Sequence, residues 1–165
     1  MISDLFANNK LILNGILIFS ILTLSIAYFV QYVLGHKPCN LCLVERYPYI
    51  GAIILISLIF IINRFQKLIF FIILLFFIFG VIVSFYHVGI EQGFFEESFV
   101  CDLGNTGNIL SKEDLLKQLK SNTVVSCKNV TFRILGFSLA TINTVLSFIL
   151  SVIMIKLLKD YEKNK

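Results

Sequence analysis

Four cysteines are the residues of this sequence best suited to chemistry. Cys39 and Cys42 form a C-x-x-C motif, and Cys101 and Cys127 follow far apart along the chain. A C-x-x-C motif can bind zinc, attach haem or exchange electrons, but haem attachment requires His directly after the second cysteine, and Leu43 stands there. An even number of cysteines permits two disulfides, and the four can pair in three ways.

The residues after the motif predict that Cys42 is a thiolate. If a helix begins near Cys42, its sulfur lies where free backbone N–H groups concentrate positive potential. Arg46, four residues on, shares that helix face, and both effects favour thiolate over thiol. A guanidinium inside an apolar segment is costly and marks a functional site by default. Glu45 is a candidate partner for it; the alternative is an Arg46 that only extends to the membrane interface.

The second pair of cysteines lies in one long polar connection. If Cys101 and Cys127 pair, they close a loop worth roughly 3.5 kcal/mol of chain entropy. In isolation such a disulfide is best explained as a structural crosslink. Beside a redox-active C-x-x-C on the same face, an exchangeable disulfide is favoured. His87, at the end of an apolar segment, either hydrogen-bonds a ligand carbonyl or simply lies at the interface.

Four apolar segments must position these side chains. The chain has 165 residues and is 58% hydrophobic, which is far more than a soluble domain of that size can bury. About 20 residues cross the hydrocarbon core as a helix. We therefore expect an all-α membrane protein, a four-transmembrane-helix bundle forming a single domain over residues 1–165. The expected spans are about 11–34, 43–62, 68–88 and 134–158.

Four spans put both ends of the chain on one side of the membrane. The connections 35–42 and 89–133, which hold all four cysteines, then face the other side. Lys and Arg near the span ends weakly favour cytoplasmic termini, and disulfides persist outside the cytosol, so two extracytoplasmic cysteine-bearing loops are expected. Within the long loop, residues 111–120 predict an amphipathic helix that lies on the membrane surface or packs on its own domain.

Two other features limit the class of protein. The net charge of +4 is scattered, without the concentrated basic patch that nucleic-acid binding needs, and the Lys-rich C-terminal tail is better suited to anionic lipid headgroups. The first apolar segment exceeds the usual length of a signal-peptide core and has no A-x-A-like site after it, which disfavours cleavage.

Three stretches resemble the DsbB family of disulfide-bond formation proteins over nearly the whole chain. The most specific is Lys37-Pro-Cys-Asn-Leu-Cys-Leu-Val-Glu-Arg46, a C-x-x-C followed after two residues by Glu and Arg. The others are Tyr86-His-Val-Gly-Ile-Glu91, and Cys127 followed by Leu135-Gly-Phe-Ser-Leu-Ala-Thr-Ile-Asn143. Many members of that family carry Trp just before the position of Asn143, where this chain has Ile142.

The resemblance implies a bacterial inner-membrane enzyme, a thiol:quinone oxidoreductase that reoxidises a periplasmic DsbA-like thioredoxin-fold protein. The resemblance further implies that Cys101 forms the mixed disulfide with that partner and that Cys127 is the cysteine paired with Cys101. It also implies that Cys39 and Cys42 pass electrons to ubiquinone or menaquinone. Cys42, Arg46 and His87 match quinone-binding positions, and no metal is implied. A DsbA–DsbB–quinone relay is the known means of keeping the periplasm oxidising, and that role is the family's rather than an inference from these residues.

Two different classes of protein remain open from the residues alone. A membrane scaffold with a structural four-cysteine zinc site would use all four thiolates, although the second pair is not a C-x-x-C and Arg46 has no role there. A transporter with crosslinked loops would need polar residues along a path through the membrane. Beyond Glu45, Arg46 and His87, the spans offer mainly uncharged polar side chains, such as Asn143 and a few Ser and Thr, which are too little for an ion pathway.

Overall fold

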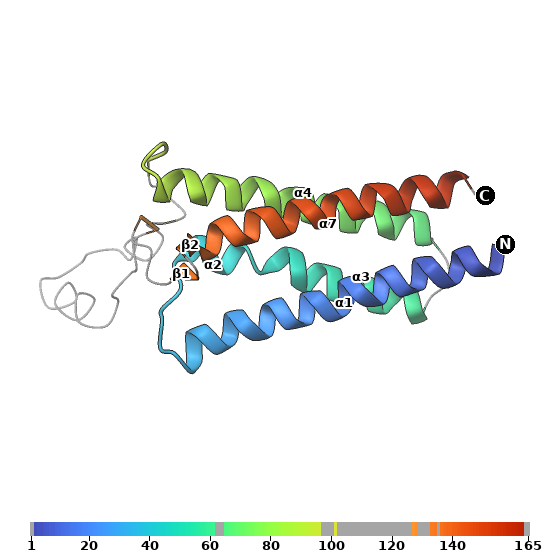
Figure 1. Ribbon diagram of the computed structural model, residues 1–165, viewed down its shortest axis with the longest axis horizontal. Helices are drawn as coiled ribbons and strands as arrows, with labels where there is room; N and C mark the ends of the chain where they lie inside the picture. The colour runs from blue at the N-terminus through green and yellow to red at the C-terminus, as the bar shows by residue number, and fades with distance from the viewer. Residues whose placement is uncertain are drawn as a thin grey trace, which may run out of the picture.

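Four long helices lie alongside one another in the computed structural model, which describes residues 2–61, 65–96, 101, 127–128, 133–134 and 136–163. They are α1 (Ile2–Tyr32), α3 (Tyr47–Ile61), α4 (Gln66–Glu91) and α7 (Leu139–Lys163), with a short α2 (Asn40–Val44) before α3. Both ends of the chain lie at one end of the bundle, and α2 lies at the other (Figure 1). The helix expected at 111–120 falls outside the described residues.

In the described part of the chain, four helical segments are long and apolar enough to cross a membrane, which confirms the expected all-α fold with four spans. They are Lys10–Tyr32, Asn40–Ile61, Gln66–Glu91 and Leu139–Lys163. Large apolar side chains are exposed along their outer faces, among them Leu22, Phe29, Ile82 and Phe148. Lipid is the solvent that such faces require, since a soluble protein rarely exposes so much contiguous apolar surface.

The second span differs from the single helix expected over 43–62. It begins at Asn40, so Cys42 lies in the first turn of α2 and not in the 35–42 connection. It is then interrupted by a turn at Glu45 and Arg46 before α3 begins. Pro48 explains the break, because it has no N–H to donate to the carbonyl four residues back and its ring crowds that carbonyl. Because of the break, the side chains of Glu45 and Arg46 do not follow the regular spacing of a helix.

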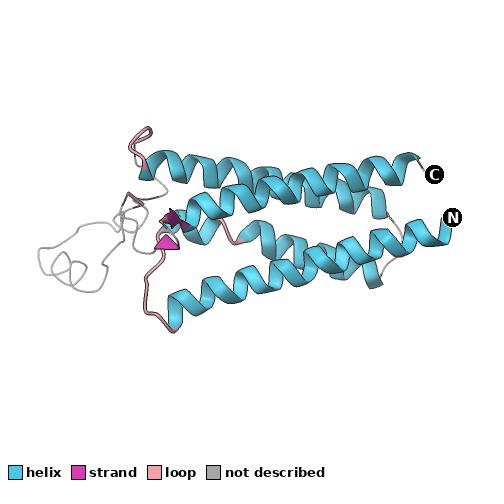
Figure 2. Ribbon diagram, in the orientation of Figure 1, coloured by secondary structure: helices cyan, strands magenta, loops and turns pink. Residues whose placement is uncertain are grey.

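The fourth span begins at Leu139, five residues later than the expected start at 134, and continues beyond 158 to Lys163. A two-stranded antiparallel hairpin precedes it, formed by β1 (Arg133–Ile134) and β2 (Phe137–Ser138) (Figure 2). Gly136 in its turn has a φ of +87°, a conformation that glycine adopts without strain. The Ser138 hydroxyl accepts a hydrogen bond from the backbone N–H of Thr141 and so caps the new helix.

The third span is also longer than the expected 68–88, since α4 runs from Gln66 to Glu91. It ends where Gly93 takes a φ of +78°, the left-handed conformation that commonly closes helices. The three extra residues after 88 matter for the site, because they carry Glu91 on the same helix as His87, one turn further on.

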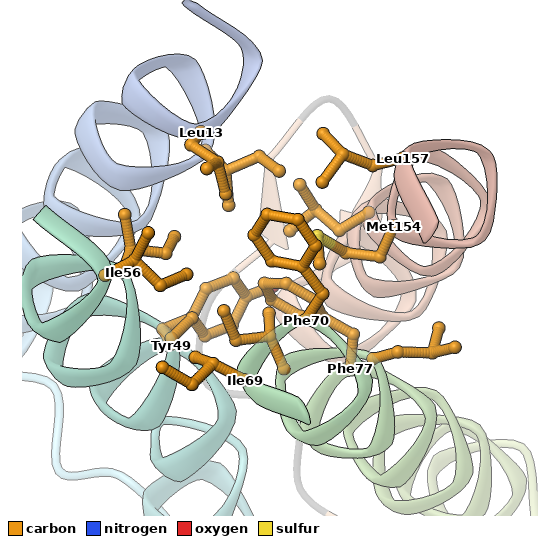
Figure 3. Packing of buried hydrophobic residues seen from close by; sticks show 14 residues of the cluster. Leu13, Tyr49, Ile56, Ile69, Phe70, Phe77, Met154 and Leu157 are labelled. Carbon is orange, nitrogen blue, oxygen red and sulfur yellow. The ribbon is translucent and has the colours of Figure 1, made fainter. Parts of the chain in front are cut away.

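The apolar core lies in the half of the bundle nearer the chain ends. Buried side chains from all four long helices meet there, including Leu13, Ile56, Phe77 and Met154 (Figure 3). Helix α4 packs most closely on α7, and α3 packs on α4. A Cβ atom added to Gly80 of α4 would lie 3.2 Å from both Pro48 and Ser147, so a small residue is what allows the three helices to approach.

Candidate active site: a sulfur cluster with a histidine–carboxylate pair

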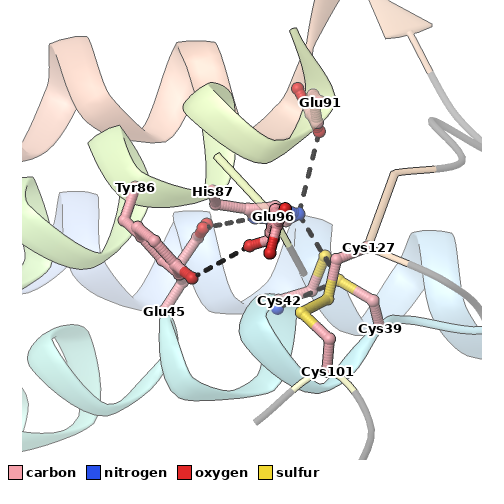
Figure 4. Close-up of a disulfide and its surroundings, with 9 residues drawn as sticks. All are labelled: Cys39, Cys42, Glu45, Tyr86, His87, Glu91, Glu96, Cys101 and Cys127. Carbon is pink, nitrogen blue, oxygen red and sulfur yellow. Dashed lines mark hydrogen bonds and ion pairs between the residues drawn. A yellow bond between two sulfur atoms is a disulfide. The ribbon is translucent and has the colours of Figure 1, made fainter. Parts of the chain in front are cut away.

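All four cysteines meet at the end of the bundle opposite the chain termini. Cys101 and Cys127 form a disulfide, with 6.0 Å between their Cα atoms. Both are buried in one cluster with Cys39, and Cys42 packs against that cluster. Figure 4 shows the disulfide beside the two sulfurs of the C-x-x-C pair. Segments far apart in the sequence therefore bring two sulfur pairs within one buried site.

Cys39 and Cys42 are free thiols in this structure. Their Sγ atoms lie 2.8 Å apart and share a hydrogen bond. Cys39 is also the N-cap of α2, where its sulfur accepts a hydrogen bond from the backbone N–H of Cys42. The C-x-x-C spacing thus places one sulfur at the cap and the other in the first turn of the same helix, close enough to exchange between dithiol and disulfide.

A histidine lies next to Cys39, and a carboxylate lies on the far side of the histidine ring. The Nε2 atom of His87 is 3.5 Å from the Cys39 sulfur, and its Nδ1 atom is 2.7 Å from Oε1 of Glu45. Only 2% of His87 and 7% of Glu45 are exposed. A carboxylate only accepts hydrogen bonds, so Nδ1 donates to Glu45 and Nε2 faces the sulfur. Thiol, imidazole and carboxylate in this order form the arrangement in which a histidine can take a proton from a nucleophile.

Glu45 is itself held by α7. Its second oxygen, Oε2, accepts a hydrogen bond of 2.9 Å from the side-chain amide of Asn143. The amide oxygen of Asn143 in turn accepts from the hydroxyl of Tyr49, at 2.5 Å. A buried charge of this kind is tolerated only when its oxygens are fully hydrogen-bonded. The network therefore fixes Glu45, and through Glu45 it fixes the ring of His87.

These contacts identify Cys39 as the anionic sulfur of the reduced pair. The hydrogen bond with the Cys42 thiol, together with hydrogen bonding and charge from His87, lowers the pKa of Cys39 from 9.0 to about 5 against the opposing effect of burial. This differs from the expectation that Cys42 is the thiolate. That expectation assumed an unbroken helix with Arg46 on the face of Cys42, and the turn at Glu45 and Arg46 removes the assumption.

Arg46 instead faces the first helix. Its Nη1 donates a 2.7 Å hydrogen bond to the side-chain oxygen of Gln31. Its guanidinium carbon lies 4.9 Å from the centre of the Tyr28 ring, a distance at which a cation is attracted to the ring face. Arg46 is thus neither paired with Glu45, as the sequence suggested, nor extended freely into the interface.

A cavity of about 400 Å³ opens beside the two free thiols. Its walls come from α1, α7 and the start of the second span, and they are mostly apolar, with Phe19, Leu22, Ile142 and Leu146 among them. The polar groups gather at one end, where Cys39, Cys42, Arg46, His87 and Glu91 line it. A mostly apolar cavity of this volume with a few convergent polar groups is the usual form of a small-molecule site.

Sequence reasoning missed several members of this site. Gln31 and Tyr28 lie within the first span, and nothing local to them indicates a contact with Arg46. Asn143 was visible as a rare polar residue inside a span, and such residues commonly mark function. The pairing of Glu45 with His87 joins positions 42 apart in the sequence, and no spacing rule reaches that far.

The four-cysteine zinc site considered from the sequence is not formed in this arrangement. Zinc needs thiolates, and two of the four sulfurs are joined to each other in the Cys101–Cys127 disulfide. Instead, an oxidised pair of cysteines lies beside a reduced pair.

The model of the family described as "Disulfide bond formation protein DsbB" matches residues 9–157, which is most of the chain. The chain belongs to the DsbB family. The match covers all four candidate spans down to the last turns of α7 and includes the four cysteines, Arg46 and His87. Family membership indicates a thiol oxidoreductase with a role in disulfide formation, embedded in a membrane by several spans.

A protein of Rickettsia prowazekii (strain Madrid E), described as "Uncharacterized protein RP370", is 32% identical to this DsbB-family chain over 155 residues. The aligned region covers 93% of this chain and 90% of the Rickettsia protein. No solved structure matches the chain significantly.

Proposed function

We propose that this DsbB-family protein is a thiol:quinone oxidoreductase of a bacterial inner membrane that reoxidises a periplasmic, DsbA-like thioredoxin-fold protein. The observation that carries the proposal is the meeting of four elements: a disulfide, a reduced C-x-x-C pair, a histidine–carboxylate pair and an apolar cavity. The proposed orientation has cytoplasmic chain ends and an extracytoplasmic sulfur cluster, because a disulfide that exchanges with secreted partners must lie in an oxidising compartment.

Electrons enter through Cys101 and Cys127. A thiolate of the partner attacks the disulfide at Cys101, forms a mixed disulfide and releases the Cys127 thiolate. That thiolate attacks the Cys39–Cys42 disulfide at Cys39 and releases Cys42. The partner's second thiol then frees Cys101, which attacks the Cys127–Cys39 bond. The result is an oxidised partner, a restored Cys101–Cys127 disulfide and a reduced C-x-x-C pair.

The low pKa of Cys39 supports this order of exchange. Cys39 is the leaving sulfur of the last attack, and a thiol of low pKa leaves faster in thiol–disulfide exchange. Its burial in one cluster with Cys101 and Cys127 supports direct transfer between the pairs. The state described above, with an intact loop disulfide and two free thiols, corresponds to the enzyme after this transfer.

Electrons leave through the cavity. A quinone supplies an acceptor for two electrons and two protons, and the dithiol of Cys39 and Cys42 yields that number when it closes to a disulfide. Arg46 offers N–H donors at the polar end of the cavity, where Gln31 and Tyr28 fix its direction. His87 takes the proton of the C-x-x-C pair at Nε2, and Glu45 stabilises the charged ring through Nδ1. The apolar walls suit an isoprenoid tail and exclude water.

The test is anaerobic mixing of purified full-length protein with a reduced thioredoxin-fold oxidase and a short-chain ubiquinone or menaquinone, with quinol formation followed by absorbance. The wild type should form quinol. A variant with Cys101→Ser and Cys127→Ser should form none with the protein partner, yet it should still form quinol when a small dithiol supplies electrons. Cys39→Ser should fail with both donors. Quinol formation by Cys39→Ser at the wild-type rate would refute the relay.

A further inference from the structure

Three soft donor atoms converge at the reduced C-x-x-C pair. The sulfurs of Cys39 and Cys42 and the Nε2 atom of His87 all lie within 4.8 Å of one another. Two thiolates and an imidazole are a donor set that suits zinc and other soft d¹⁰ cations. The set exists only when the pair is reduced, because a disulfide offers no thiolate.

The distances between these atoms are close to those of a tetrahedral metal site. Zinc binds sulfur at about 2.3 Å and nitrogen at about 2.0–2.1 Å, so a tetrahedral site separates sulfur from nitrogen by about 3.6 Å and sulfur from sulfur by about 3.8 Å. The Cys39 sulfur is 3.5 Å from His87 Nε2, and the two sulfurs are 2.8 Å apart. A rotation of the half-buried Cys42 side chain that opens the sulfur pair by about 1 Å brings the sulfur–sulfur distance to the tetrahedral value, and the Cys42 sulfur already lies within 4.8 Å of Nε2.

A second observation points to a ligand on the far side of the imidazole. A histidine that binds a metal through one ring nitrogen almost always donates the other N–H to a carboxylate or carbonyl, which fixes the ring and raises its basicity. Here Nδ1 of His87 donates to Glu45, and the amide of Asn143 holds that carboxylate in place. Nε2 thereby faces the Cys39 sulfur at 3.5 Å, and the Cys42 sulfur lies within 4.8 Å of it.

We propose that the reduced form of this protein binds one divalent cation with an affinity for both thiolate and imidazole, such as Zn²⁺, through Cys39, Cys42 and His87. The fourth position faces the cavity, where it is available to water or to Glu91, whose carboxylate oxygen lies 3.8 Å from Nε2. The cation displaces the protons of the thiols. It occupies both electron-donating sulfurs, so the pair cannot close to a disulfide until the cation leaves. Zn²⁺ is then a reversible inhibitor that acts only on the reduced enzyme.

Binding can be measured independently of catalysis, with Co²⁺ as the spectroscopic probe. Full-length protein in detergent is reduced and desalted under anaerobic conditions and titrated with Co²⁺, then Zn²⁺ is used to displace it. We expect one Co²⁺ per chain, with the thiolate-to-cobalt charge-transfer band and the visible bands of a tetrahedral site. Protein whose four cysteines are all oxidised should bind no Co²⁺ and show none of these bands. This comparison needs no substitution.

Variants then locate the ligands. Glu45→Gln should weaken binding by about tenfold to a hundredfold, as expected for loss of the carboxylate behind a metal-binding histidine. His87→Gln should weaken it further, and the control Arg133→Gln, at an exposed position of the hairpin, should leave it unchanged. A variant with Cys101→Ser and Cys127→Ser should bind one Co²⁺ as the wild type does. Cobalt binding that is equal in oxidised protein, or indifferent to His87→Gln, would overturn the proposal, as would the absence of binding at millimolar Co²⁺.

Only the inhibition depends on the function proposed above, and the two can fail separately. Zn²⁺ should block quinol formation by prereduced protein, and a chelator should restore it. If the protein forms quinol but binds no Co²⁺, the metal site is refuted and the redox function stands. If it binds Co²⁺ with the expected variants but forms no quinol, the site stands and the redox function is refuted.

Discussion

The two halves of the bundle are built on opposite principles. Toward the chain ends, apolar side chains such as Ile56, Phe77 and Met154 fill the interior. At the sulfur end the interior holds a carboxylate and an imidazole, and a cavity of about 400 Å³ lies beside them. A buried charge costs stability unless its partners compensate for its desolvation. The apolar half therefore holds the helices together, and the sulfur end is arranged for reactivity.

The largest expected difference between the halves is in catalysis. Replacing Cys39 with Ser removes a sulfur that must enter a disulfide, so quinol formation should be lost completely. Thermal unfolding in detergent should change little, because the substitution is nearly isosteric. Catalysis would be followed by quinol absorbance and unfolding by circular dichroism. A large fall in unfolding temperature would mean that the sulfur end also contributes substantially to the stability of the fold.

A substitution in the apolar half should do the reverse. Met154→Ala removes a fully buried side chain and should cost about 2–5 kcal/mol of unfolding free energy. Quinol formation per folded molecule should stay near the wild-type rate. The matched control on the same helix is Val152→Ala, which is half exposed and should cost less than about 0.5 kcal/mol. Equal losses for both would show that α7 is not packed as described.

Much of the apolar half follows from the sequence, and much of the sulfur end does not. Long apolar runs need lipid, so the number of spans and the common side of the cysteines could be predicted. Helices such as α3 are apolar on every side, however, so no hydrophobic face indicates how they rotate. The contacts of Glu45 with His87 and of Arg46 with Gln31 depend on that rotation. Pro48 accounts for the break in the second span, but the contacts that Arg46 makes beyond the break depend on a distant helix and could not be predicted from the sequence.

Arg46 tests whether the cavity serves the acceptor. Arg46→Met removes the charged hydrogen-bond donor from the polar end of the cavity, and loss of one such bond costs about 1.5–3 kcal/mol. The specificity constant kcat/KM for quinone should fall by about tenfold to a hundredfold, while KM for the protein partner stays the same. Arg133→Met, an exposed arginine of the hairpin, is the control. Unchanged steady-state kinetics toward quinone would remove Arg46 from the site.

The smallest expected effect is on the protonation of the Cys39 sulfur. Because the pKa of Cys39 is lowered to about 5, its thiolate should persist from neutral pH down to near pH 5 and be lost below it. The rate of alkylation of Cys39 by iodoacetamide, followed by mass spectrometry on reduced protein, should show that midpoint. Glu45→Gln removes the carboxylate that stabilises a charged His87 ring, so His87 stabilises the thiolate less. The midpoint should therefore rise toward the ordinary value of 9.0. A midpoint that is near 9.0 in the wild type would contradict the assignment of Cys39 as the anionic sulfur.

The most direct measurement is a single turnover without the loop disulfide. The Cys101→Ser, Cys127→Ser variant is reduced, freed of reductant and mixed anaerobically with excess quinone, and quinol is counted against protein. If Cys39 and Cys42 give their electrons to an acceptor in the adjoining cavity, one quinol forms per chain and both thiols disappear. If no quinol forms and both thiols remain open to alkylation, the sulfur pair and the cavity do not work together, and the account fails.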